Sequence, residues 1–242
     1  MNIFNIHLEF NREKLFHGID TRIADGKPGY ICVCDSSVVT RVQYQEEYRK
    51  VINGAFMNTC DGSMICTLAN KIYGPGLESI NGPEIFAKYT KIPYKQVIIG
   101  NTEEIVQMVR EKVREDVDDS HIDHLQVPFC NVDEFDYKGI ADEINKKEYD
   151  IIWVSLGNPK QEIFMSKILP YLNKGVLFGI GAALNFWVGA LALPRFHVGS
   201  MRFIWLTRIF QDPARQIRMN WPILKTLPKM YREEKRKAKV KY

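Results

Sequence analysis

The chain has 242 residues, of which 45% are hydrophobic and 26% charged, and its formal net charge is +4. This length allows one large domain or two small ones, and the composition excludes a disordered chain, a collagen-like chain and a polytopic membrane protein. The five cysteines have no CxxC spacing, so neither a disulfide framework nor a zinc site is predicted, and a reducing, cytoplasmic compartment is expected. The N-terminal segment has no apolar run of the secretory type.

Short apolar runs alternate with amphipathic stretches along the chain. The apolar runs predict strands at 30–34, near 55, and at 96–99, 124–127, 151–156 and 176–180. The amphipathic stretches predict helices at 42–52, 63–73, 102–113, 138–147 and 159–172. The helix at 102–113 is the clearest, because Asn101 and Glu104 are spaced as a capping box. This order predicts an α/β fold, with a mostly parallel, Rossmann-like sheet and helices on both of its faces.

One segment has the length of a membrane span. Gly175 to Pro194 is a run of twenty residues without a charge, about the length that a bilayer requires. Glycines interrupt it, and Asn185 lies near its centre. A buried strand that leads into a loop explains this pattern better than a transmembrane helix does.

The positive charge is concentrated near the C-terminus. Residues 202–242 hold twelve Lys and Arg against three acidic residues, which leaves residues 1–201 with a net charge of −5. We therefore predict an α/β domain at 1–197 and a helical, basic appendage at 198–242. Such a basic segment either meets a polyanion, such as nucleic acid or an anionic membrane, or only keeps the chain soluble.

The loops that follow the predicted strands are the candidate ligand site, because parallel α/β sheets bind ligands beyond the carboxyl ends of their strands. None of these loops is a Walker A or GxGxxG motif, which argues against ATP hydrolysis and dinucleotide binding. The loops at 99–104 and 156–162 place backbone N–H groups at helix N-termini, where phosphate binds. Plain capping is the alternative, with Asn158 at the N-cap and Pro159 at the first helical position.

Two sets of titratable residues were weighed as sites. Asp61 lies directly before Gly62 in a loop that follows a predicted strand, so it is a candidate catalytic base, although Asp-Gly is also a common turn. His121 and His124 have i, i+3 spacing, but they lie among acidic residues in a predicted exposed loop without an evident third ligand. No metal is predicted there.

Three motifs follow one another in the second half of the chain: DIIWVSLGNPKQEIFM, GVLFGIGAALNFWVGAL and IWLTRIFQDPARQIR. In this order they resemble the WecG/TagA/CpsF family of bacterial glycosyltransferases. The likeness also covers MNTCDGSMIC, ESINGPEIF and IIGNTEEIVQMVREKV, so it spans roughly residues 15–220. Members of that family pass an N-acetylmannosamine-type sugar from UDP to an undecaprenyl-diphosphate-linked acceptor sugar, with inversion at the anomeric carbon. The resemblance implies this reaction class, a UDP-sugar donor and a polyprenyl-diphosphate-linked acceptor.

The resemblance also implies roles for individual residues. Asp61 matches the proposed general base and Gln161 the active-site glutamine, and an inverting transfer needs one carboxylate to take the proton of the acceptor hydroxyl. Arg208, Arg215 and Arg218 match arginines that would neutralise the departing diphosphate. The other predicted substrate-binding residues are Asn58, Thr59, Gly62, Gly82, Gly100, Asn101, Thr102, Gly157, Pro159, Lys160, Glu162 and Asn185. No cofactor and no metal are expected.

Some positions depart from the family pattern. Ser79 replaces a charged active-site residue, Asn185 replaces an aspartate and Ile204 replaces a glutamate, and the usual Thr-x-Asn is not clearly kept near Asp35 and Ser36. These changes keep open an alternative function, a catalytically inactive nucleotide-sugar-binding or scaffold protein of the same fold. Nucleic acid is not an expected partner, because no predicted sheet face carries interleaved aromatic and basic residues.

The end of the chain is predicted to bind an anionic membrane surface. Residues 225–242 hold eight basic and two acidic side chains, and Trp221, Leu224 and Leu227 lie close to them, as in an interfacial segment. We expect a cytoplasmic enzyme that associates peripherally with the inner face of the cell membrane. The sequence leaves open whether the chain forms a homo-oligomer.

Overall fold

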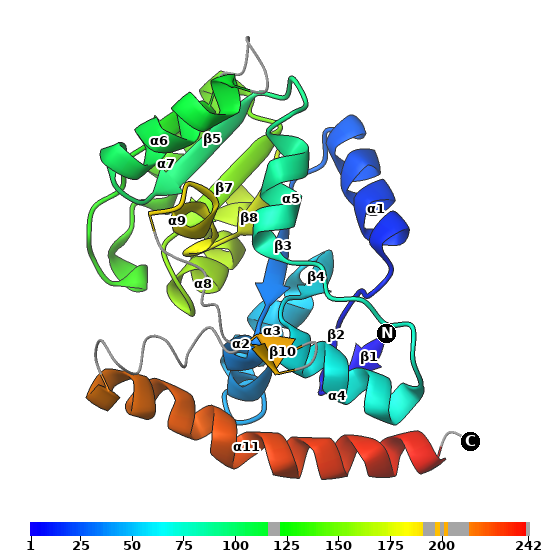
Figure 1. Ribbon diagram of the computed structural model, residues 1–242. Helices are drawn as coiled ribbons and strands as arrows, with labels where there is room; N and C mark the ends of the chain where they lie inside the picture. Colours follow the sequence, from blue (N-terminus) through cyan, green and yellow to red (C-terminus); the bar gives the residue numbers. More distant parts are fainter. Residues whose placement is uncertain (116–121, 191–196, 199–200, 203–212, 241–242) are drawn as a thin grey trace.

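The computed structural model describes residues 1–115, 122–190, 197–198, 201–202 and 213–240, with side chains described up to 190 and over 221–239. Its centre is a six-stranded parallel sheet in the order β4-β3-β8-β7-β5-β6 (Figure 1). The strands are β3 (Gly29–Cys34), β4 (Met57–Cys60), β5 (Gln96–Gly100), β6 (Ile122–Leu125), β7 (Ile151–Ser155) and β8 (Val176–Gly179). The predicted parallel α/β sheet is confirmed.

The central strands are buried on both faces, which explains why their sequences are continuously apolar rather than alternating. Trp153 is fully buried at the middle of β7, where its ring packs 4.8 Å from that of Phe178 and 4.9 Å from that of Phe86. Its indole N–H donates to Gln96 Oε1 at 2.8 Å, so the one polar atom of this large side chain is satisfied.

Helices cover both faces of the sheet, as predicted. One face carries α1 (Arg12–Ala24), α5 (Gly82–Tyr89), α6 (Glu103–Arg114) and α9 (Ala183–Trp187). The other face carries α2 (Ser36–Arg41), α3 (Glu46–Gly54), α4 (Ser63–Tyr73), α7 (Tyr137–Lys147) and α8 (Lys160–Ile168). Short elements complete these layers: the antiparallel pair β1 (Asn2–Ile3) and β2 (Ile6–His7), the pair β9 (His197–Val198) and β10 (Met201–Arg202), and the 3-10 turns η1 (Val132–Glu134) and η2 (Leu169–Tyr171).

The direction in which the chain moves across the sheet to its next strand reverses between β5 and β7. From β5 the chain passes through α6 outward to β6, whereas from β7 it passes through α8 in the opposite direction to β8. These two helices therefore lie on opposite faces of the sheet, as the two apolar cores show. Such a reversal leaves space at the carboxyl ends of the two strands, which is the usual place for a ligand in this class of fold.

A long C-terminal helix, α11 (Pro213–Val240), packs against α2 and α4. It runs across the end of the molecule toward which β3 points (Figure 1). Met230, Glu234 and Ala238 are buried, and the Glu234 carboxylate accepts hydrogen bonds from Phe4 N (3.1 Å) and Tyr73 Oη (2.6 Å). The predicted C-terminal helix is confirmed over Pro213–Val240, whereas residues 201–202 of the predicted helical appendage form strand β10. Within the described parts of the chain, no helix is long and apolar enough to span a bilayer.

The predicted helix boundaries need correction in several places. The expected helix at 42–52 begins only at Glu46, as α3, and a separate helix, α2, lies before it. At the end of α2 the Gln43 side chain donates to Val39 O and to Phe4 O. The N-cap of α6 is Thr102, not Asn101, which has a φ of 68°. Four helices of the described chain were not predicted, namely α1, α2, α5 and α9.

The start of α8 also differs from the prediction. This helix begins at Lys160, and the Asn158–Pro159 peptide bond is cis. The prediction that Asn158 caps this helix is wrong, because its side chain bonds to Tyr48 and Glu162 instead.

His124 was expected in an exposed loop, but it lies in β6. Its imidazole is nearly buried, with Nδ1 at 2.6 Å from Glu103 Oε2 and Nε2 at 3.0 Å from Gly100 O. His121 lies outside the described residues.

Candidate active site

Asp35 and Asp61 lie side by side at the carboxyl edge of the sheet. They follow Cys34 and Cys60, which are register partners on the adjacent parallel strands β3 and β4. The backbone N–H of Asp61 donates to Cys34 O at 2.9 Å, which continues this pairing by one residue. The topology therefore brings two carboxylates together from positions far apart in the sequence.

The surroundings of this pair disfavour its charged form. Asp61 is half-buried, and desolvation together with the nearby charge of Asp35 raises its pKa to about 7. Asp35 is reached by solvent, but desolvation by the protein atoms around its carboxylate raises its pKa as well. The backbone N–H groups of Val38 and Ser37 and the charge of Arg41 lower the pKa and offset part of this rise. Asp61 is thus poised to accept a proton near neutral pH.

A third carboxylate, Glu162, lies at the start of α8 and is completely buried. It accepts hydrogen bonds from Gln161 Nε2 (2.8 Å) and Asn158 Nδ2 (3.3 Å), and the Tyr48 hydroxyl bonds to it as well. Burial is the main cause that raises its pKa to about 7, and Asp35 adds to the effect. Glu162 is therefore the centre of a polar network in the protein interior.

Three further polar side chains join the loops after β5, β7 and β8. Asn101 Nδ2 donates to Asn185 Oδ1 (3.0 Å) and to Ser155 Oγ (3.2 Å), and Ser155 Oγ donates to Gly181 O (2.8 Å). Gly181 also lies against the carboxamide of Gln161, since a Cβ built on it would lie 3.1 Å from Gln161 Oε1. The carboxylate and amide groups thus form one continuous polar edge.

Several predicted site residues occupy backbone positions on this edge. Gly62 and Gly157 have φ values of 109° and 78°, which favour glycine, and Gly100 has a φ of 80° with Leu156 and Ser155 too close for a side chain. Gly62 immediately precedes α4, and Pro159 immediately precedes α8. Gly82 is buried in the first turn of α5. The positive φ angles of Gly62, Gly100 and Gly157 show why side chains are disfavoured at these three positions.

Three other predicted substrate-binding residues have structural partners. Asn58 is buried and its Nδ2 donates to His7 O and Ile52 O, while Thr59 Oγ1 donates to Ile80 O. Lys160 Nζ donates to Cys130 O and lies over the rings of Phe129 and Phe135. The structure does not bring these three side chains to the carboxylates.

Arg208 lies outside the described residues, and Arg215 and Arg218 lie in α11 at a position where only the backbone is described. Their spacing of three residues places them on neighbouring positions of one helix face.

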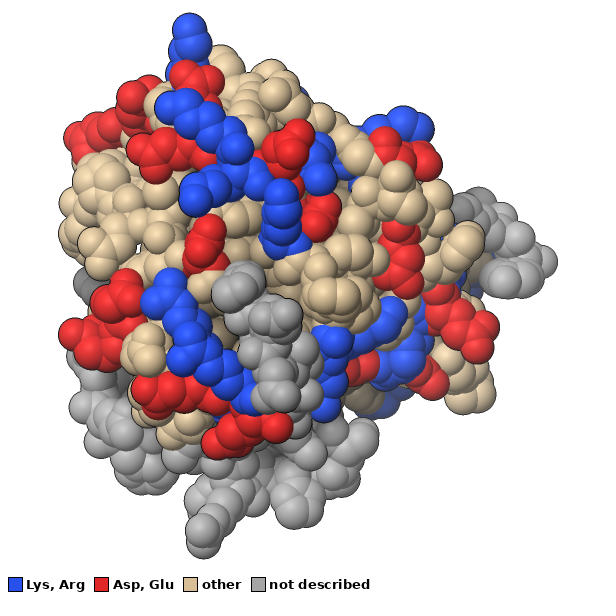
Figure 2. Space-filling view, turned by 90° about the horizontal axis from the view of Figure 1, so that it is seen from above, with Lys and Arg blue, Asp and Glu red and all other residues tan. Residues whose placement is uncertain are grey.

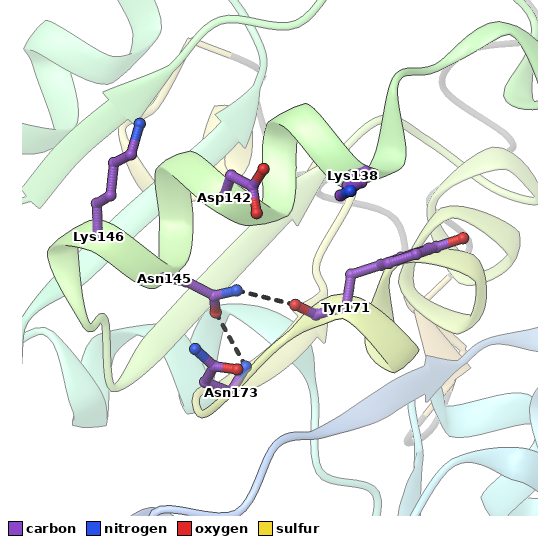
Figure 3. Close-up of a pocket in the computed structure, with 6 residues that line it drawn as sticks. All are labelled: Lys138, Asp142, Asn145, Lys146, Tyr171 and Asn173. Carbon is purple, nitrogen blue, oxygen red and sulfur yellow. Dashed lines mark hydrogen bonds between the residues drawn. The ribbon is translucent and has the colours of Figure 1, made fainter.

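A pocket of about 550 Å³ lies elsewhere, between α7 and the segment before β8 (Figure 3). Asn145 donates to Tyr171 O (2.8 Å) and accepts from Asn173 N (2.9 Å), so its amide holds the two segments together. Asn173 precedes β8 and Asn145 lies near the end of α7, which leads into β7. The pocket therefore lies at the amino edge of the sheet, opposite the carboxylates.

The described residues contain no group of three or more His, Cys, Asp or Glu side chains that is arranged to hold a metal ion.

Sequence reasoning missed four residues of this edge, namely Asp35, Arg41, Tyr48 and Ser155. Asp35 directly follows a predicted strand, so its position was visible, but its pairing with Asp61 was not. Tyr48 lies on α3 and reaches the site through contacts with Glu162 and with Asn158, which is 110 residues away in the sequence. No local pattern could have revealed these contacts.

Comparison with known proteins agrees with the motifs. The sequence profile of the Glycosyl transferase WecG/TagA/CpsF family matches residues 1–240. The chain belongs to this family.

Two relatives carry the same name, N-acetylglucosaminyldiphosphoundecaprenol N-acetyl-beta-D-mannosaminyltransferase. One, from Staphylococcus aureus (strain MW2), is 24% identical over 217 residues, which cover 88% of this chain and 82% of the relative. The other, from Bacillus spizizenii, is 23% identical over 228 residues, which cover 92% of this chain and 86% of the relative. The polar edge described above is thus found in a chain of the WecG/TagA/CpsF glycosyltransferase family.

Proposed function

We propose that this chain transfers a sugar from a UDP-sugar donor to a polyprenyl-diphosphate-linked acceptor sugar, with inversion at the anomeric carbon. The observation that carries the proposal is the Asp61 carboxylate, half-buried at the end of β4 beside Asp35, with a pKa raised to about 7. The relatives are named for transfer of N-acetylmannosamine to an undecaprenyl-diphosphate-linked acceptor, which supports the transfer of a sugar of this kind and this class of acceptor.

In this mechanism Asp61 acts as the general base. Its carboxylate takes the proton of the acceptor hydroxyl while that oxygen forms a bond to the anomeric carbon, and UDP leaves from the opposite face of the sugar. The bond between the anomeric carbon and the diphosphate oxygen breaks with both electrons going to UDP. One displacement of this kind inverts the configuration, so one base is sufficient.

Positive charge is needed where the diphosphate leaves. The first turns of α6 and α8 point backbone N–H groups toward the carboxyl edge of the sheet, and helix N-termini of this kind attract phosphate. We assign the stronger part of this role to Arg208, Arg215 and Arg218, on the evidence of their match to the family motif. Gln161 and the Asn101–Asn185 pair would then contact the sugar.

A donor screen tests the proposed reaction. Purified full-length protein is offered several UDP-sugars, UDP-N-acetylmannosamine among them, together with a polyprenyl-diphosphate-linked N-acetylglucosamine acceptor. Mass spectrometry of the lipid should reveal the addition of one sugar. If no donor supports transfer while UDP-sugars still bind, the catalytically inactive binding protein becomes the better description.

We further propose that the outward face of α11 docks on an anionic membrane, where the lipid-linked acceptor lies. Trp221 and Leu224 are 63% and 52% exposed. The exposed basic residues Lys225, Lys229 and Arg232 follow at helical spacing, on the face opposite to buried Met230 and Glu234. By contrast, the amino end of the sheet shows interspersed acidic and basic side chains in Figure 2.

A further inference from the structure

Only the NH2 end of the Gln161 carboxamide is hydrogen-bonded within the described residues. Gln161 is 5% exposed, and its Nε2 donates to Glu162 Oε1 at 2.8 Å. Its Oε1 is buried and has no hydrogen-bond partner among the described residues. A buried acceptor without a donor is unfavourable, so an atom of this kind indicates a partner that is supplied by a ligand.

The free oxygen lies beside the loop that follows β8. A Cβ built on Gly181 would lie 3.1 Å from Gln161 Oε1, and one built on Gly179 would lie 3.2 Å from Nε2. Because both positions are glycine, the backbone approaches the amide closely and no side chain separates them. Gly181 O in turn accepts from Ser155, which bonds to Asn101. The oxygen therefore faces the polar edge that we assign to the sugar.

Glu162 decides which end of the amide faces this edge. An ionised carboxylate only accepts hydrogen bonds, so the NH2 end of Gln161 must point to Glu162 and the oxygen must point away. Glu162 itself is fixed by Asn158 at 3.3 Å and by the Tyr48 hydroxyl. The orientation of the Gln161 amide thus follows from the charge of Glu162, which does not itself face the substrate.

We propose that Glu162 is a positioning residue that holds the Gln161 carboxamide with Oε1 toward the Gly179–Gly181 loop, where this oxygen accepts a hydrogen bond from a hydroxyl or acetamido N–H group of the sugar. The inference rests on the proposed sugar transfer for the identity of the ligand. The orientation of the amide is independent of that assignment and is tested separately.

The kinetic test is a double-mutant cycle on the full-length protein. Glu162→Gln keeps the shape of the side chain but allows the Gln161 amide to flip, so that its NH2 group and its oxygen exchange places. This is possible because the new amide at position 162 can donate as well as accept. We expect it to lower kcat/KM by about 10- to 100-fold, the cost of a buried hydrogen bond that is lost or reversed. In a Gln161→Ala background the same substitution should cost less than about threefold, because the group through which it acts is gone. Equal losses in both backgrounds would show a merely structural role and overturn the proposal.

A matched control separates this effect from the loss of any buried carboxylate. Glu9→Gln removes the charge of a glutamate that is 5% exposed, pairs with Thr59 of β4 and bonds to Phe10 N and Asn11 N rather than to Gln161 or Glu162. Its transfer activity should stay at the wild-type level. If Glu9→Gln lowers kcat/KM as much as Glu162→Gln does, the loss is not specific to Gln161 and the proposal is wrong.

A spectroscopic test needs no sugar transfer. With 15N-labelled glutamine, the side-chain NH2 signals of Gln161 are identified by their absence in Gln161→Ala. The groups around Glu162 are the Tyr48 hydroxyl, the Cys32 and Cys34 thiols, the Asp35 carboxylate and the amides of Asn158 and Gln161. Because burial raises the pKa of Glu162 to about 7, the Gln161 signals should move with a midpoint near pH 7 in the wild type.

In Glu162→Gln the same signals should be displaced and should lose this titration. Gln161 signals that are identical in the two proteins would show that Glu162 does not hold the amide, whether or not the protein transfers sugar. If the signals behave as expected but no donor supports transfer, the positioning is upheld and only the proposed reaction fails.

Discussion

The backbone N–H of Asp61 donates to the carbonyl oxygen of Cys34, the residue before Asp35, at 2.9 Å. This hydrogen bond extends the pairing of β3 and β4 and keeps the two aspartates at the same level on neighbouring strands. Desolvation is the main cause that raises the pKa of Asp61, and the like charge of Asp35 raises it further. A base with a pKa near the working pH is the most effective proton acceptor.

Asp61→Asn should abolish sugar transfer while UDP binding persists. The amide keeps the shape of the side chain but cannot accept the acceptor proton, and loss of a general base costs about 10² to 10⁴ in rate. Calorimetric titration with UDP reports binding and also shows that the variant is folded. Asp142→Asn, an exposed residue at the opposite edge of the sheet, should leave turnover unchanged. Wild-type turnover in Asp61→Asn would remove Asp61 from the mechanism.

The pH dependence of transfer should report the ionisation of Asp61. The base must be deprotonated, so kcat/KM should rise about tenfold per pH unit below pH 7 and level off above it. Asp35→Asn removes the neighbouring charge, which lowers the pKa of Asp61 and moves this rise to lower pH. Asparagine can still cap α2 by accepting from Val38 N, so the fold should be kept. An unchanged profile in Asp35→Asn would show that the two carboxylates do not interact.

Sugar transfer should continue in the presence of EDTA. The described residues hold no cluster of metal ligands, and we assign the charge of the departing diphosphate to arginines and helix N-termini. The measurement compares initial rates with EDTA, with added Mg²⁺ and with added Mn²⁺. Activity that disappears with EDTA and returns with either ion would require a metal in the mechanism.

Removal of positive charge from the outward face of α11 should weaken binding to anionic vesicles. Deletion of residues 225–242 is a poor test, because it also removes buried Met230 and Glu234. The triple change Lys225→Gln, Lys229→Gln and Arg232→Gln leaves that buried face intact. At about 1 kcal/mol for each charge, it should weaken binding roughly 100-fold at low salt and less at high salt.

The matched control for this prediction carries the same number of changes on another helix. Lys138, Lys146 and Lys147 are exposed on α7, and their replacement by glutamine should leave vesicle binding near the wild-type level. Both triple variants are compared by co-sedimentation and by transfer to long-chain and short-chain lipid acceptors. Equal binding by the two would mean that net charge alone, and not the face of α11, attracts the protein to the membrane.

Local sequence patterns were sufficient for much of the fold and for part of the site. Apolar runs and amphipathic periods are properties of neighbouring residues, so they placed the six strands of the sheet and most of the helices around it. They also placed Asp61 in the turn after β4. The missed helices α2, α5 and α9 are short, and α1 has only a weak amphipathic pattern. The end of α2 is fixed by a contact of Gln43 with Phe4 that no local signal contains.

What only the tertiary structure decided is which side chains meet. The order of strands brings Asp35 beside Asp61, and the contact between Asn158 and Tyr48 joins residues that are 110 positions apart. The contact of Glu234 with Phe4 N spans 230 positions and fixes which face of α11 remains outward. The sequence by itself determined most of the elements, the glycosyltransferase family through its motifs and the basic end of the chain. Pairing, burial and the resulting pKa values depend on groups that are distant along the chain, so they became visible only in the folded structure.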